Sequence, residues 1–135
     1  MCSIVAPNTA KGVRALVAVA DGMGGHQGGE VASGLAIEGV VAHLGKNSNV
    51  DLIGGDRSET LAQVIHQIHE QVQAKSNTPE TRGMGTTLSI AVIGDENVIV
   101  GHVGDSRIYR ARNGQFTQLT EDHSWVAEEV KRGNL

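Results

Sequence analysis

The hydrophobic periodicity changes three times along the chain, and the order of these changes restricts the fold more than any other feature. An apolar run over 13–20 predicts a buried strand that comes first. Apolar residues then recur three and four positions apart over 29–44 and 58–75, which predicts two helices. After Pro79 the pattern is typical of strands, over 86–93, 98–103, 106–112 and 115–119. One more helix is expected over 124–132.

Two turn sequences indicate how the later strands are connected. Residues 94–97, Gly-Asp-Glu-Asn, are expected to form a hairpin turn, and Asn113-Gly114 is the strongest short hairpin sequence in the chain. A strand, two helices and an antiparallel meander predict the α+β class rather than alternating parallel units.

Length, charge and cysteine content exclude several classes of protein. The 135 residues suffice for one small domain, with a formal net charge of -4 and no basic run longer than Lys131-Arg132. With only three aromatic side chains, this argues against nucleic-acid binding. Cys2 is the only cysteine, so a disulfide framework or zinc cluster is not expected. We expect no membrane span and no signal peptide, and therefore a cytoplasmic location.

Two aspartates follow apolar strands and are candidate metal ligands. Asp21 comes after the run Val-Ala-Val-Ala and opens a glycine-rich turn, where Gly22 brings a backbone carbonyl close by. Asp105 follows the expected strand 98–103 and is preceded by Gly104. Carboxylate and carbonyl oxygens suit Mg²⁺ or Mn²⁺ better than zinc or copper. The two acids can share a metal site at one rim of a sheet, or each can simply bond backbone amides at a turn.

The glycines after Asp21 do not form a nucleotide-binding loop. A dinucleotide fingerprint that starts at Gly22 requires glycine where Gln27 stands, and no Gly-Lys-Ser/Thr sequence is present for a P-loop. An ordinary strand-to-helix connection remains the alternative to a metal-binding turn.

Of the six histidines, only His26 lies in the glycine-rich turn beside Asp21, where a general acid is useful. A structural role for His26 remains open. The order of His66, His69 and Glu70 does not match a metalloprotease helix. We expect surface or structural roles for the other five: His43, His66, His69, His102 and His123.

Four segments together resemble a known family. They are Asp-Gly-Met-Gly-Gly-His with Gly-Glu-Val-Ala-Ser within 21–33, Gly-Thr-Thr at 85–87, Gly-Asp-Ser-Arg at 104–107 and Leu-Thr-Glu-Asp-His-Ser at 119–124. In this order and spacing, over nearly the whole chain, they resemble the bacterial metal-dependent serine/threonine protein phosphatases of the PPM (type 2C) family.

The resemblance implies a fold, a chemistry and partners. It implies an αββα sandwich, in which two antiparallel sheets are flanked by helix pairs. It also implies hydrolysis of phosphoserine or phosphothreonine in proteins by a water that two Mn²⁺ or Mg²⁺ ions activate. Asp21 would bridge these ions, the carbonyl of Gly22 would bind one of them, and Asp105 would help to hold a third. The implied partners are phosphorylated proteins and a cognate kinase or its substrates.

The chain departs from the family pattern near both ends. Residues 1–16 show neither the phosphate-binding arginine nor the Asn-acid-Asp segment of the family's first strand, and the later Asp-Gly and Asp-Asn pairs are not present. Met23 stands where members with a shorter turn carry histidine. We therefore expect residues 1–135 to be a single phosphatase domain that lacks the family's N-terminal strand and C-terminal portion. The alternative is a catalytically inactive, phosphatase-like module that binds phosphoproteins or a regulatory partner.

Overall fold

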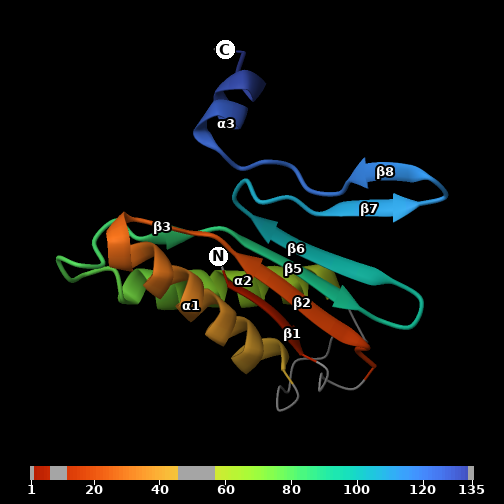
Figure 1. Cartoon of the computed structure of the whole chain (residues 1–135), viewed down its shortest axis with the longest axis horizontal. Helices are drawn as coiled ribbons and strands as arrows, with labels where there is room; N and C mark the ends of the chain where they lie inside the picture. Colours follow the sequence, from red (N-terminus) through yellow and green to blue (C-terminus); the bar gives the residue numbers. More distant parts are fainter. Residues whose placement is uncertain (1, 7–11, 46–56, 134–135) are drawn as a thin grey trace.

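A computed structural model describes residues 2–6, 12–45 and 57–133 (Figure 1). Its central element is a four-stranded antiparallel sheet, in the order β1-β2-β5-β6. These strands are β1 (Cys2–Ala6), β2 (Ala15–Ala20), β5 (Leu88–Ile93) and β6 (Val98–Val103). Helices α1 (Gly25–Leu44) and α2 (Arg57–Ala74) lie side by side on one face of this sheet (Figure 1).

The core forms between these two helices and the sheet. Alternate residues of β2 and β5 are buried, because side chains of a strand point to opposite faces in turn. They pack against buried aliphatic side chains of α1 and α2. The cluster comprises Leu16, Ala18, Ala20, Leu88, Ile90 and Val92 from the sheet, and Ala36, Ile37, Val40, Leu44, Leu61, Val64 and Ile68 from the helices.

The first part of the chain differs from the sequence prediction in two ways. The strand expected over 13–20 begins at Ala15, and it is not the first, because β1 precedes it and pairs with it antiparallel. Helix α1 begins at Gly25, four residues before the expected start. Gly28 and Gly29 are poor helix formers, but both are buried in the first turns of α1, so tertiary packing outweighs their propensity.

The strands after α2 also differ in detail. The strand expected over 86–93 is split at Thr87 into β4 (Gly85–Thr86) and β5, and β4 pairs with the short β3 (Gly22–Met23). Strand β6 has the expected bounds. The hairpin of β7 (Tyr109–Arg112) and β8 (Gln115–Gln118) forms a separate two-stranded sheet, so the predicted single meander is wrong.

The ends of that hairpin have clear physical causes. Asn113 and Gly114 have φ values of 53° and 76°, as the tight turn between β7 and β8 requires. The strand expected from 106 begins only at Tyr109, because the residues before it bond to other segments: the Ser106 hydroxyl bonds to Thr87, and the Ile108 amide donates to the Thr120 hydroxyl at 3.1 Å.

The α+β class is confirmed, with helices on one face of the main sheet. The β7–β8 hairpin lies on the other side of that sheet, and α3 (Trp125–Lys131) projects away from it (Figure 1). A groove of about 290 Å³, lined by Val17, Val19 and Ala91 among others, separates the sheet from residues 106–109. The described elements therefore form one helix layer, one sheet and a hairpin, rather than a full sandwich. None of the described helices is long and apolar enough to span a bilayer.

Candidate metal centre

The sheet topology places Asp21 and Asp105 at the same rim. Strands β2 and β6 both pair antiparallel with β5, so they run parallel to each other and end at the same edge. Asp21 directly follows β2, and Asp105 comes two residues after β6. Both aspartates are exposed. The expectation that the two strand ends meet at one rim is confirmed.

Thr87 connects the two segments that carry these aspartates. Its hydroxyl oxygen accepts a hydrogen bond from the amide of Asp21 at 3.1 Å and is hydrogen-bonded to the hydroxyl of Ser106 at 2.7 Å. The Thr87 amide in turn donates to the carbonyl oxygen of Asp21 at 2.9 Å. The side chain also packs against Gly104, where an added Cβ would lie 2.7 Å from Thr87 Cγ2. One side chain thus fixes the backbone next to both candidate ligands.

The turn after Asp21 depends on a close approach of two glycines. A Cβ on Gly22 would lie 1.8 Å from the carbonyl oxygen of Gly29, and one on Gly29 would lie 2.8 Å from the carbonyl oxygen of Gly22. Only residues without side chains allow the turn to lie this close to the first turns of α1. The carbonyl of Gly22, a predicted ligand, therefore lies against the N-terminal end of α1.

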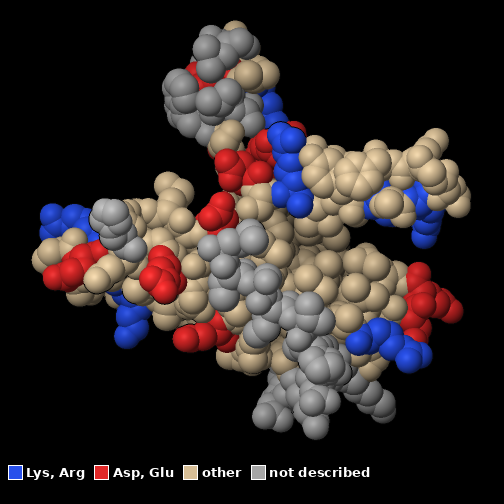
Figure 2. Space-filling model, viewed as in Figure 1, with Lys and Arg blue, Asp and Glu red and all other residues tan. Residues whose placement is uncertain are grey.

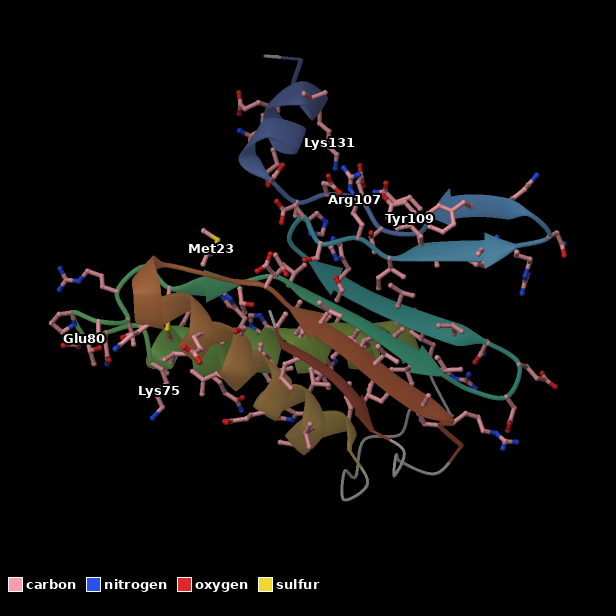
Figure 3. All side chains as sticks on the ribbon, in the orientation of Figure 1. Met23, Lys75, Glu80, Arg107, Tyr109 and Lys131 are labelled. Carbon is pink, nitrogen blue, oxygen red and sulfur yellow. The ribbon has the colours of Figure 1, made fainter. Side chains whose placement is uncertain are left out.

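The other predicted site residue, His26, does not lie in a loop. Its backbone belongs to the first turn of α1, and its side chain lies outside the described residues. Met23 lies on the outer side of the rim and points away from α1 (Figure 3). Its side chain is 67% exposed, so it contributes little to the core.

A second network near the rim was not predicted from the sequence. Arg107 donates two hydrogen bonds to the carboxylate of Asp122, at 2.9 and 2.7 Å, and one to the Tyr109 hydroxyl at 3.3 Å. The hydrogen bonds from Arg107 hold the pKa of Asp122 below its ordinary value, and the carboxylate raises the pKa of Arg107. Figure 3 shows Arg107 and Tyr109 at the base of the hairpin. The bidentate pair joins the residues after Asp105 to the segment before α3.

A further ion pair continues this network toward α3. Lys131 of α3 contacts the carboxylate of Glu121 at 2.7 Å, and this lowers the pKa of Glu121. Acidic side chains gather where the chain leaves the sheet for α3 (Figure 2). Two sequence segments contain charged residues of this network and could have indicated it: Gly-Asp-Ser-Arg at 104–107 and Glu-Asp-His at 121–123.

The donors at the rim have the right chemistry for a hard cation. Two carboxylates and a backbone carbonyl offer only oxygen, and Mg²⁺ in proteins is commonly held by one or two carboxylates together with waters. Within the described residues, no three metal-ligating side chains come together. The residues therefore fit part of a Mg²⁺ or Mn²⁺ coordination sphere.

Comparison with known proteins identifies the family. The profile of the family "Protein phosphatase 2C" matches residues 6–131. The chain belongs to the protein phosphatase 2C family. One curated relative is the serine/threonine phosphatase stp of Listeria monocytogenes serotype 4b. It is 36% identical to this chain over 121 residues, and the match covers 89% of this chain and 48% of the relative. The chain spans about half the length of the curated relatives it matches.

Solved structures of protein phosphatase 2C relatives have the same fold. The S. agalactiae serine/threonine phosphatase is similar with a TM-score of 0.83 and 32% identity, covering 99% of this chain and 54% of that one. The catalytic domain of PstP in complex with two manganese ions gives a TM-score of 0.74 and 34% identity, covering 99% of this chain and 59% of that one. These relatives are serine/threonine phosphatases, and the structure of one of them contains manganese ions.

Proposed function

We propose that the chain is part of an enzyme that hydrolyses phosphoserine and phosphothreonine in proteins with the help of Mn²⁺ or Mg²⁺. The observation that carries this proposal is the placement of Asp21 and Asp105 at one rim, joined through Thr87. The likeness to PstP, whose structure contains two manganese ions, supports the choice of metal.

Each rim residue has a distinct role in this proposal. Asp21 and the carbonyl of Gly22 hold the pair of ions, and Asp105 helps to hold a third. When bound, such ions supply an activated water and neutralise charge on the phosphoryl oxygens. Thr87 keeps the Asp21 turn and the Asp105 loop at a fixed separation, because its hydroxyl bonds to both. His26, in the first turn of α1, is proposed as the acid that protonates the leaving oxygen.

We also propose that residues 1–135 belong to a single phosphatase domain with the αββα sandwich of its family. The sheet face opposite α1 and α2 carries half-buried apolar residues, Val17, Val19 and Ala91, in the groove beneath residues 106–109. A half-buried apolar face of this kind suits the packing of a second sheet. In this arrangement the β7–β8 hairpin is part of that second sheet.

The substrate in this proposal is a phosphorylated protein, and a cognate kinase or its substrates are the proposed partners. The test is release of phosphate from a phosphothreonine peptide by the purified chain, with and without Mn²⁺. Wild-type chain should show Mn²⁺-dependent release, and Asp21→Asn and Asp105→Asn should each remove it. Glu96→Gln, an exposed acid on the β5–β6 turn at the far end of the sheet, serves as the matched control.

One observation favours a second function. The described residues bring no three metal-ligating side chains together, so they supply fewer ligands than a closed metal site needs. The second candidate is a catalytically inactive module that binds phosphoproteins or a regulatory partner. Binding of the same phosphopeptide by wild-type chain, with no phosphate release at any Mn²⁺ concentration, is the result expected from this module.

A further inference from the structure

One glycine in the interior of α1 has no structural reason within the described chain. Glycine weakens a helix, so it is usually kept where a side chain does not fit. This holds for Gly39, where an added Cβ would lie 2.8 Å from Ile68 Cγ1, and for Gly29 against Gly22. At Gly34 an added Cβ would meet no atom within 4 Å. The missing side chain at Gly34 therefore leaves open space on the outside of the helix.

That space is the centre of a groove on one face of α1. The residues around it are three or four positions apart, which places them on one side of a helix. The groove has a volume of about 490 Å³ and is lined by Gln27, Glu30, Val31, Gly34, Leu35 and Glu38. Val31 is 40% exposed although its side chain is apolar. The groove is thus lined by the apolar side chains of Val31 and Leu35 together with polar ones, and Gly34 contributes no side chain to it.

The two charged side chains that line the groove restrict what can bind there. Glu30 and Glu38 are both exposed, and neither carboxylate has a hydrogen bond or ion pair with another described residue. No lysine or arginine lines the groove. The two glutamates are eight positions apart, which corresponds to about 12 Å along the helix axis. A negatively charged partner is repelled here, and one with two cations about 12 Å apart is attracted.

We propose that this face of α1 binds an amphipathic helix of a partner protein. The partner helix places a large apolar side chain over Gly34, between Val31 and Leu35, and a lysine or arginine about one turn away on either side of it pairs with Glu30 and Glu38. A glycine at a helix contact allows two helices to approach closely. The groove lies on the helical side of the sheet, whereas Asp21 lies at its rim. This contact is therefore separate from the proposed chemistry.

The test uses the full chain and a synthetic peptide. The probe is a fluorescein-labelled peptide that forms an amphipathic helix, with leucine in the middle of one face and a lysine about one turn away on either side. Fluorescence anisotropy measures its dissociation constant. Wild-type chain should bind it, and Gly34→Leu should weaken binding at least about tenfold, because the leucine fills the groove. Gln67→Leu, which adds the same side chain to an exposed position of α2, should leave binding unchanged.

A second variant tests the charges. Glu30→Gln with Glu38→Gln should weaken binding and remove most of its dependence on salt, because two ion pairs are lost. The matched control, Glu70→Gln with Glu96→Gln, removes two charges outside the groove. It should keep the wild-type affinity for the peptide and the wild-type dependence on salt. Circular dichroism verifies that each variant is folded.

Three results would overturn the proposal. The first is failure of wild-type chain to bind the peptide, and the second is equal binding by wild-type chain and the Gly34→Leu variant. The third is concentration-dependent dimerisation of wild-type chain that Gly34→Leu abolishes in sedimentation velocity, because the groove is then occupied by a second copy. None of these readouts depends on metal or on phosphatase activity, so this proposal can fail while the proposed function stands.

Discussion

Replacement of Thr87 by valine should destabilise the rim, because it removes the hydroxyl that connects its two sides. Valine keeps the shape of threonine, so the packing against Gly104 is retained. Two hydrogen bonds are lost, the one from the Asp21 amide at 3.1 Å and the one to the Ser106 hydroxyl at 2.7 Å. A hydrogen bond contributes about 0.5–1.5 kcal/mol net, so the expected loss in the free energy of unfolding is about 1–3 kcal/mol. Asp21 is exposed, so water can replace the partner that its amide loses. We therefore expect a loss in the lower half of this range of unfolding free energy.

Urea unfolding of wild-type chain, Thr87→Val and Thr87→Ser measures this loss. The serine variant keeps the hydroxyl and loses one methyl group, so it should cost no more than about 0.8 kcal/mol. Amide hydrogen exchange adds a local measurement: the Asp21 amide should exchange faster in the valine variant and at the wild-type rate in the serine variant. Equal unfolding midpoints for valine and wild type, together with an unchanged Asp21 exchange rate, would show that Thr87 does not connect the rim.

Three further outcomes are expected. Gly22→Ala should destabilise the chain by at least about 3 kcal/mol in urea unfolding, since its Cβ would lie 1.8 Å from the Gly29 carbonyl oxygen; a wild-type midpoint would disprove this close approach. Gly39→Ala should lower the thermal midpoint through its contact with an isoleucine of α2, and a higher midpoint would mean that helix propensity outweighs the clash. The lowered pKa of Asp122 stabilises the fold above the unfolded-state pKa of about 4, and this contribution is lost as the pH falls through the folded-state pKa. Asp122→Asn should therefore flatten the fall of the urea midpoint between about pH 5 and 2, and an unchanged slope would refute the role of its bond with Arg107.

The sequence predicted the ends of strands better than the contacts between them. Asp21 and Asp105 were recognised because each follows an apolar run and lies next to a glycine, which are local patterns. Their meeting at one rim was confirmed by the sheet topology. Thr87 was recognised only as part of a motif, because its bonds join residues that are 66 and 19 positions away. No local pattern reports such bonds.

Errors in the element bounds have the same origin. The glycines at 25, 28 and 29 favour a loop by propensity, yet α1 includes them, because Gly28 packs against Met84 and Gly29 against Gly22. This changes the setting of His26 from a loop to a helix turn. The strand at 106–108 has suitable residues, but their polar groups bond to Thr87, Asp122 and Thr120 instead of a neighbouring strand. Tertiary contacts outweighed local preference in both cases.

The position of β5 between β2 and β6 makes the shared rim of Asp21 and Asp105 depend on the folding of the whole sheet. Asp21 and Asp105 lie far apart in sequence and share an edge only when β5 pairs with both neighbours. In the proposed function, the ions held by Asp21 and Asp105 would have no comparable site in the unfolded chain, so their binding free energy would add to the stability of the sheet. Raising the free Mn²⁺ concentration from its dissociation constant to one hundred times that value would add roughly 2.3 kcal/mol. If ions bind at the rim as proposed, the pairing of β5 with β2 and β6 would transmit their binding free energy to the whole sheet.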